Sequence, residues 1–440
     1  MAVVGIALGA VAVLALLVYV HRYVWRRFVG DTTAAGSPLR RAGTVAAYTL
    51  PLLSVGALVS GRSGAPFWLQ QVLAWPGYLW LAALLYLTLA LLVGEAVRPL
   101  LRRLLARRAA AGTPAAPTQT QAQAHAETQA MATTTPQAAA PAPAPAPAPV
   151  STPVSAPAPA PAPAADPSRR LFVARAVGGA AAVAGLGTTG YGAYGVLRGP
   201  RVKRVTVPLA RLPRSAHGFR IAVVSDIHLG PILGRAHTRR IVDTVNRTQP
   251  DLIAVVGDLV DGSVDDLGPA AEPLAGLRSR HGAFFVTGNH EYYSGAAQWV
   301  DHVRELGLHP LENARVEIGG FDLAGVNDIG GESEGHGPDF GRALGDRDRT
   351  RAAVLMAHQP VVIDEAVEHG VDLQLSGHTH GGQLWPGNYI AELSNPTVAG
   401  LERYGDTQLY VTRGAGAWGP PVRVGAPSDI TVVELASRQA

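Results

Sequence analysis

The sequence predicts a membrane region followed by a soluble domain of the layered α/β class. Three observations lead to this prediction. Long apolar runs with few charges occupy the N-terminal part, and a Pro-rich stretch follows them. Beyond residue 200, short β-branched runs alternate with helical stretches, which is the pattern of a sheet covered by helices. Hydrophobic residues make up 48% of the chain and charged residues 16%, a balance that favours a membrane protein.

Apolar segments in the N-terminal region are long enough to cross a bilayer. Residues 3–20 form an unbroken apolar run, 44–60 is a weaker candidate, and 76–97 is the strongest. We therefore predict that residues 1–108 form a membrane region with three transmembrane helices. The alternative, a buried helix of a soluble domain, fits poorly with their length and scarcity of charge.

Two further segments join this region to the soluble domain. Residues 109–167 are mostly Ala, Pro, Thr and Gln, so we expect a disordered, extended linker. Arg169 and Arg170 precede a weakly apolar run at 176–197, which resembles a twin-arginine export signal in an internal position. The alternative is that residues 168–198 form a fourth transmembrane helix. Both interpretations carry the chain across the membrane in the same direction.

Arginine residues are distributed unevenly around these runs. Segments 21–43 and 98–170 are rich in Arg, whereas 61–75 contains only Arg62. By the positive-inside rule, the N-terminus lies outside, the linker inside, and everything after Arg198 outside. We expect a multi-pass protein of the cell membrane with its soluble domain on the extracytoplasmic face. The net charge of +4 follows from this pattern, and no nucleic-acid partner is expected.

The soluble domain is expected to comprise residues 199–440. Its buried strands are predicted where apolar, β-branched runs occur, at 219–225, 252–256, 283–287, 353–356 and 373–375. Helices are predicted between them, for example at 234–247 and 296–306. In open α/β sheets, ligands bind beyond the carboxyl ends of the strands. Polar residues directly after these runs are therefore the candidates for a functional site.

Five short polar blocks follow the predicted strands. Each contains Asp, Asn or His, and the blocks are Asp226-Ile227-His228, Gly257-Asp258, Gly288-Asn289-His290-Glu291, Ala357-His358 and Gly377-His378-Thr379-His380-Gly381. Side chains two residues apart on an extended segment face the same way, so Asp226 and His228 can bind together. Carboxylate, amide oxygen and imidazole suit manganese, iron or zinc better than calcium. The chain has no cysteine, which excludes thiolate ligands and a Cys nucleophile.

Charge counting favours two divalent cations and a phosphate substrate. Two such ions contribute four positive charges, and Asp226, Asp258 and a bridging hydroxide subtract three, leaving about one to attract a phosphate oxygen. A cation pair can also lower the pKa of a shared water and create a nucleophile. His290, beside Asn289, is placed to protonate the leaving oxygen. These residues predict hydrolysis of a phosphate ester.

The ordered blocks resemble the calcineurin-like metallophosphoesterase superfamily, whose motifs D-x-H, G-D, G-N-H-[DE], H and G-H-x-H occur here in order. Segments 376–383 and 414–421 resemble its bacterial membrane-associated branch, some members of which carry twin-arginine signals. The resemblance implies a four-layer α/β/β/α sandwich with two divalent ions (Mn, Fe or Zn), and His290 as the catalytic residue. The implied ligands are Asp226, His228 and His380 for one ion, Asn289, His358 and His378 for the other, and Asp258 bridging both.

We therefore expect a membrane-tethered binuclear phosphoesterase that uses a metal-bridging hydroxide on phosphodiesters, lipid or cell-envelope esters among them. Two alternatives stand beside it: a phosphomonoesterase acting on soluble nucleotides or metabolites, and a catalytically inactive membrane sensor or scaffold. The expected partners are the substrate, the lipid bilayer and the twin-arginine export machinery. Asp261, Asp265 and Asp266 are expected in a solvated loop, with a role in shaping substrate entry as the alternative. Trp385 and Trp418 are expected to pack within loops, with contact to lipid or substrate as the alternative.

Overall fold

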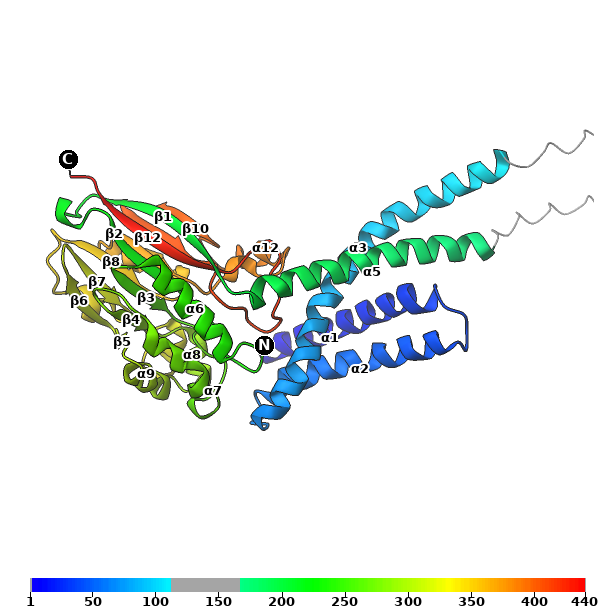
Figure 1. The fold of residues 1–440 in the computed structure, drawn as a ribbon, viewed down its shortest axis with the longest axis horizontal. Helices are drawn as coiled ribbons and strands as arrows, with labels where there is room; N and C mark the ends of the chain where they lie inside the picture. The colour runs from blue at the N-terminus through cyan, green and yellow to red at the C-terminus, as the bar shows by residue number, and fades with distance from the viewer. Residues whose placement is uncertain (1, 112–166, 440) are drawn as a thin grey trace, which may run out of the picture.

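The computed structural model describes residues 2–111 and 167–439 (Figure 1). The linker expected at 109–167 lies almost entirely outside these described residues. The described part consists of a group of long helices at one end and two β-sheets with shorter helices at the other (Figure 1). The mixed α/β class expected for the soluble domain is confirmed.

The N-terminal region is helical. Its elements are α1 (Ala2–Trp25), a π-helical continuation (Arg26–Gly30), α2 (Pro38–Ser60), α3 (Phe67–Ala111) and α5 (Pro167–Leu197). Among the described residues, three helices are long and apolar enough to cross a membrane, namely α2, α3 and α5. They contain the segments predicted at 44–60, 76–97 and 176–197, and the segment predicted at 3–20 lies in α1. Because α3 begins at Phe67, the connection after α2 is shorter than the sequence suggested.

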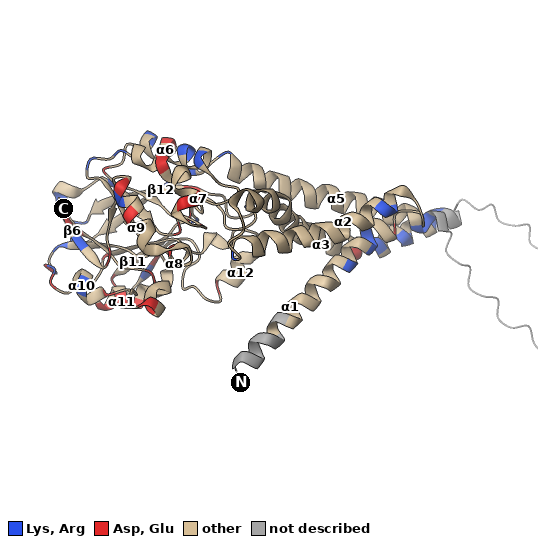
Figure 2. Ribbon diagram, turned by 90° about the horizontal axis from the view of Figure 1, so that it is seen from below, with Lys and Arg blue, Asp and Glu red and all other residues tan. Residues whose placement is uncertain are grey.

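Basic residues gather at the end of these helices that is far from the soluble domain (Figure 2). Arg27 pairs there with Asp31 and with Glu95, each at 2.9 Å. Tyr23 also donates a hydrogen bond to Glu95 at 3.2 Å. The acidic side chain in the strongest apolar segment is thus neutralised at the Arg-rich end.

Two six-stranded sheets form the soluble domain. The first has the order β1-β12-β2-β3-β4-β5, and the second has the order β10-β11-β9-β8-β7-β6. The strands of the first sheet are β1 (Arg201–Leu209), β2 (Phe219–Val224), β3 (Leu252–Val256), β4 (Ala283–Val286), β5 (His309–Pro310) and β12 (Asp429–Ser437). Those of the second sheet are β6 (Ala314–Ile318), β7 (Phe321–Gly325), β8 (Ala352–Met356), β9 (Leu373–Ser376), β10 (Gly400–Tyr404) and β11 (Thr407–Val411).

The strands predicted from apolar runs are β2, β3, β4, β8 and β9. Strands β2, β3 and β4 run parallel to one another, and so do β7, β8 and β9. Carboxyl ends of parallel strands meet at one edge of a sheet. The polar blocks that follow these strands are therefore brought to common edges.

Alternation of side chains along the strands builds three apolar clusters. Val223 and Val256 of the first sheet share a cluster with Val354 and Leu375 of the second, so the two sheets pack face to face. The opposite face of the first sheet packs against α6 (Arg235–Thr248), α7 (Val264–Ala271) and α9 (Ala296–Glu305). The opposite face of the second sheet packs against α10 (Phe340–Leu344) and α11 (Ile363–Glu368). Of two further short helices, α8 (Asn289–Ser294) begins at a metal-ligand candidate, and α12 (Gly387–Ala391) follows the last of these candidates.

The soluble domain rests directly on α3 and α5. Val422 is buried in a cluster with Ala82 and Tyr86 of α3. The Tyr86 hydroxyl donates to the carbonyl oxygen of Trp385 at 3.2 Å. The backbone N–H of Arg423 donates to the carbonyl oxygen of Gly192 in α5, also at 3.2 Å. The loops around residues 383–387 and 416–425 thus join the domain to the long helices.

Candidate metal centre

Strained backbone marks the predicted ligands. Five of the seven have left-handed φ angles, namely Asp226 (52°), His228 (48°), Asp258 (52°), His378 (70°) and His380 (53°). Each such conformation costs a residue with a side chain about 1–3 kcal/mol and persists only where the surroundings impose it. Hydrogen bonds supply that constraint: His378 N–H donates to Asp226 Oδ1 at 2.9 Å, and His228 N–H donates to the Asp258 carbonyl at 3.1 Å.

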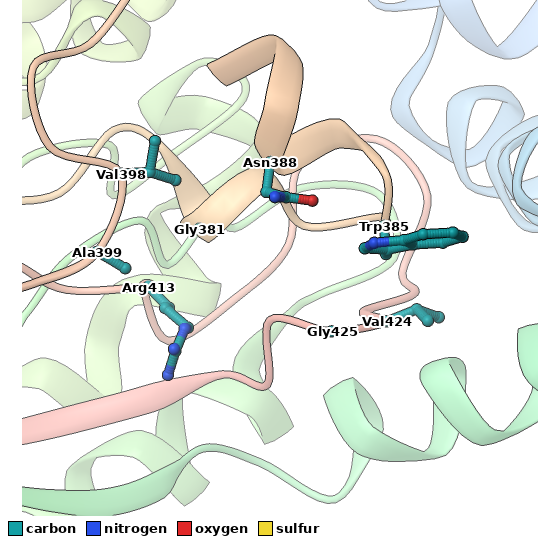
Figure 3. A pocket seen from close by; sticks show the side chains of 8 residues that line it. All are labelled: Gly381, Trp385, Asn388, Val398, Ala399, Arg413, Val424 and Gly425. Atoms are coloured by element: carbon teal, nitrogen blue, oxygen red, sulfur yellow. The ribbon is translucent and has the colours of Figure 1, made fainter. Parts of the chain in front are cut away.

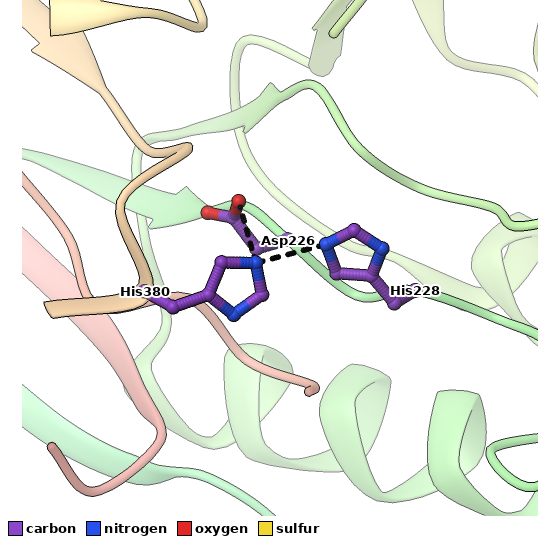
Figure 4. Close-up of side chains that lie close together, drawn as sticks. All are labelled: Asp226, His228 and His380. Atoms are coloured by element: carbon purple, nitrogen blue, oxygen red, sulfur yellow. Dashed lines mark hydrogen bonds and ion pairs between the residues drawn. The ribbon is translucent and has the colours of Figure 1, made fainter. Parts of the chain in front are cut away.

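The first group of side chains is Asp226, His228 and His380 (Figure 4). His228 Nε2 lies 2.9 Å from His380 Nε2, which lies 3.4 Å from Asp226 Oδ1. Asp261 accepts from His228 Nδ1 at 3.0 Å, and this leaves the Nε2 lone pair directed into the group. Arg423 donates to His380 Nδ1 at 3.0 Å, so His380 Nε2 carries the proton shared with His228. A cation that binds these nitrogens takes the place of that proton.

The second group is Asp258, His358 and His378, with Asn289 beside it. Asn289 Oδ1 lies 3.1 Å from His378 Nδ1. His358 Nδ1 donates to the Val256 carbonyl at 2.9 Å, and its buried Nε2 lies 3.1 Å from Asp258 Oδ2. Burial acts to lower the pKa of His358, but Asp258 outweighs burial and raises that pKa well above its usual value. A buried imidazole nitrogen against a carboxylate fits a metal ligand, because a cation can take the place of the proton between them.

Asp258 lies between the two groups. Its Oδ2 is 3.1 Å from His358 Nε2 and 3.7 Å from His228 Nε2. A third cluster, of His228, Asp258 and His290, also has ligand atoms within 4.8 Å of one another. All seven predicted ligands are thus brought to one place, with Asp258 in the middle.

Charge balance also fits bound cations. Asp226, Asp258 and Glu291 are each at most 2% exposed. Burial raises the pKa of Asp226, and it raises the pKa of Glu291 to about 7, to which the charge of Asp258 adds. Burial and the neighbouring His358 lower the pKa of His378 to about 4, which keeps its imidazole neutral and able to bind a metal. Buried carboxylates are stable only when paired, so divalent cations suit this set of donors.

Glu291 ties two of the ligand loops together. Its carboxylate accepts from the N–H groups of Gly288 at 2.6 Å, Leu259 at 2.7 Å and Asp258 at 3.0 Å. The turn that bears Asp258 is thereby fixed to the turn that bears Asn289. The sequence identified Glu291 only as a motif position, because two of its three partners, Asp258 and Leu259, lie 33 and 32 residues away in the chain.

Asp261 lies inside the site, which corrects the expectation of a solvated loop residue. Its Oδ1 is 3.0 Å from His228 Nδ1 and 2.6 Å from His290 Nδ1, and its side chain is only 23% exposed. Burial acts to raise the pKa of Asp261, but His228 and His290 outweigh burial and hold it at about 2. Asp265 is exposed, as expected. The only sequence signal for Asp261 was its place three residues after Asp258.

His290 stands at the mouth of the centre. Its ring contacts those of His228 at 4.8 Å, Tyr293 at 5.4 Å and Trp418 at 5.7 Å between centroids. Tyr293 is 75% exposed and Trp418 is 52% exposed, whereas the His290 side chain is 15% exposed. His290 therefore contacts both a predicted ligand and two exposed aromatic rings.

Comparisons with known proteins agree with this geometry. The profile of the family described as calcineurin-like phosphoesterases matches residues 219–382, a range that contains every predicted ligand. The chain is 38% identical to a transmembrane protein with metallophosphoesterase domain from Danio rerio over 259 residues, which are 56% of this chain and 59% of that protein. It is 37% identical to an uncharacterized metallophosphoesterase of Helicobacter pylori over 247 residues, covering 56% of this chain and 66% of the relative.

A shorter relative is matched over most of its length. An uncharacterized metallophosphoesterase of Aquifex aeolicus is 35% identical over 240 residues, which are 53% of this chain and 91% of that protein. The chain spans about 60% of the length of the Danio rerio relative and 66% of the Helicobacter pylori relative.

Proposed function

The chain belongs to the calcineurin-like phosphoesterase family, and from this premise we propose that it is a membrane-tethered, binuclear-metal phosphoesterase acting on phosphodiesters. The observation that carries the proposal is the convergence of the seven predicted ligands into overlapping groups around Asp258. Three apolar helices and the relative named as a transmembrane protein indicate membrane association. Esters of lipids or of the cell envelope are the substrates nearest to such a domain.

The proposal gives metal binding and proton donation to different residues of the site. When bound, two divalent cations (Mn, Fe or Zn) would polarise the phosphoryl group and lower the pKa of a shared water. Asp226, His228 and His380 would hold one of them and Asn289, His358 and His378 the other, with Asp258 between both. His290 gives a proton to the leaving oxygen from Nε2, because Asp261 holds its Nδ1 at 2.6 Å.

The orientation in the membrane belongs to the same proposal. The catalytic domain faces the extracytoplasmic side, since the Arg-rich helix ends lie away from it (Figure 2). The segment 168–198 acts as a twin-arginine signal or as a fourth transmembrane helix, residues 109–167 link it to the membrane region of residues 1–108, and 199–440 is the catalytic domain. The three apolar clusters around the two sheets support a four-layer α/β/β/α arrangement.

The test uses the full chain in detergent, loaded in turn with manganese, iron and zinc. We expect hydrolysis of bis-para-nitrophenyl phosphate that stops on chelation and returns with metal. His290→Ala should lower kcat by about 10²–10⁴-fold, the usual contribution of a general acid. His281→Ala is the matched control, because His281 is exposed and lies outside the centre.

Two results would count against the proposal. One is diester hydrolysis that survives complete chelation. The other is metal-loaded protein without activity on either the diester or the monoester. A strong preference for mono-para-nitrophenyl phosphate would replace the diesterase with the monoesterase.

A further inference from the structure

A second hollow lies beside the metal centre, on the side of the long helices (Figure 3). Its volume is about 300 Å³. Gly381, which directly follows the ligand His380, forms part of its wall, and Trp385, Asn388 and Arg413 contribute the larger polar or aromatic side chains. None of its lining residues is a predicted metal ligand, so this hollow is a separate site.

The polar groups of this pocket lack partners. Within the described part of the chain, the Arg413 guanidinium makes no hydrogen bond and no ion pair, and Arg413 is one of the residues that line the pocket (Figure 3). Asn388 Oδ1 is buried and has no hydrogen-bond partner. No carboxylate lines the pocket. A free guanidinium offers several N–H donors that match a phosphate group, and a free amide oxygen accepts from a hydroxyl.

The pocket lies where the domain meets the long helices. Its Trp385 wall accepts a hydrogen bond from Tyr86 of α3 through the backbone carbonyl. Its Val424 wall packs with the cluster that includes Ala82 and Tyr86. The pocket that Arg413 lines therefore borders α3.

Exposed apolar side chains flank the same pocket. Helix α12 follows Trp385 and presents Tyr389 at 59% and Ile390 at 70% exposure, and Leu393 just beyond it is 86% exposed. Such side chains favour a bilayer interface over water, and tyrosine and tryptophan are enriched there. We call Trp385, Tyr389, Ile390 and Leu393 the α12 surface. Its continuity with membrane-spanning α3 indicates lipid as its occupant.

We propose that the Arg413 pocket binds the phosphate of an anionic phospholipid headgroup while the α12 surface sits in the bilayer interface. Arg413 pairs with the phosphate, and a headgroup hydroxyl donates to Asn388 Oδ1. The bound lipid holds the metal centre at the membrane surface. This inference rests on the membrane placement in the proposed function and is independent of hydrolysis.

The first test measures lipid binding to the full chain by native mass spectrometry from detergent. The probes are phosphatidylglycerol, phosphatidylcholine and inorganic phosphate. We expect preferential retention of phosphatidylglycerol, with affinity reduced about tenfold or more in Arg413→Gln because a charged hydrogen-bond donor is lost. Arg278→Gln is the matched control, since Arg278 is exposed on the loop before β4.

Equal affinity of the Arg413→Gln and Arg278→Gln variants for phosphatidylglycerol would contradict the assignment of the lipid site to the Arg413 pocket. Displacement of the lipid by inorganic phosphate at similar concentration would assign the pocket to free phosphate and overturn the lipid. Neither binding measurement requires turnover. A metal-loaded protein without activity would therefore contradict the proposed function, and the lipid-binding inference would still be tested by these measurements.

The second test locates the α12 surface directly. The chain has no cysteine, so Leu393→Cys carries a single spin label. In lipid nanodiscs we expect that label to be accessible to oxygen and shielded from a water-soluble relaxing agent. A label at Val361→Cys, an exposed apolar position just before α11, should behave oppositely. Equal access of the water-soluble agent to both labels would overturn the proposal, whatever the folding of the Arg413 variant.

Discussion

Replacing Asp261 by Asn should separate orientation of His290 from metal binding. In the structure one carboxylate oxygen serves both His228 Nδ1 at 3.0 Å and His290 Nδ1 at 2.6 Å. An amide of the same size keeps one acceptor oxygen, but it has no charge and its nitrogen repels a ring N–H. The substitution therefore removes a charge-assisted contact from both histidines while the volume of the side chain stays the same.

The expected loss follows from the energy of such a contact. A hydrogen bond to a charged group contributes about 1.5–3 kcal/mol. If that energy supports the transition state, kcat/KM falls by about 10- to 150-fold at saturating metal. Because Asp261 also orients His228, we expect metal affinity to fall about 10- to 100-fold, as for other residues that support a ligand.

The assay compares kcat/KM over a metal titration with metal affinity from isothermal calorimetry. Asp265→Asn is the control, because Asp265 is an exposed acid in the first turn of α7. At saturating metal the Asp261 variant should remain slow and should show an altered pH–rate profile. Activity that returns fully to the wild-type level on adding metal would refute the role of Asp261 at His290.

Further outcomes concern stability. In metal-free protein, Glu291 has a pKa of about 7 against an ordinary 4.5, so its contribution to the free energy of unfolding is present below pH 4.5 and is lost as pH rises through 7. In denaturant unfolding, the free energy of unfolding of Glu291→Gln should therefore decline less over this pH range than that of the unchanged protein. Asp261 has the opposite pH dependence: its pKa is about 2 against an ordinary 3.8, so its contribution to the free energy of unfolding is present above pH 3.8 and is lost as pH falls through 2. The Asp261→Asn variant should not show this loss of stability. Gly377→Ala would place a methyl group against Ser225 Oγ and Asp226 Oδ2, and should lower the free energy of unfolding by about 1–3 kcal/mol where Gly319→Ala, in open space, does not.

Strand positions and ligand identities could be predicted because both are local. A buried parallel strand needs a short β-branched run, so runs such as 252–256 indicated strands. The carboxyl ends of neighbouring parallel strands meet at one edge of the sheet, so the residues after these runs indicated a site. Strand β10 lacks such a clear local signal, since it is largely exposed and pairs antiparallel at the sheet edge. Pairing of β1 with β12 joins segments more than two hundred residues apart, which local pattern does not reveal.

Asp261 was misjudged for the same physical reason. The residues after it include Gly262, Ser263, Asp265 and Asp266, which is typical of a solvated segment. Its position depends instead on His228 and on His290, which is delivered by a different strand. A charge network assembled from several loops is a property of the folded chain and leaves little trace in any one segment.

One link between the candidate metal centre and the long helices runs through Arg423. The buried guanidinium of Arg423 donates to the carbonyl oxygens of His380 and Gly416 and to His380 Nδ1. The backbone N–H of Arg423 donates to the carbonyl oxygen of Gly192 in α5. A displacement of α5 would therefore pull on a residue that directly contacts a predicted ligand. Val422, beside Arg423, is fully buried against α3, so cutting the chain after α5 would expose apolar surface next to the metal centre. The two-sheet domain and the long helices thus contact each other directly, and one of these contacts involves a residue that binds a predicted ligand.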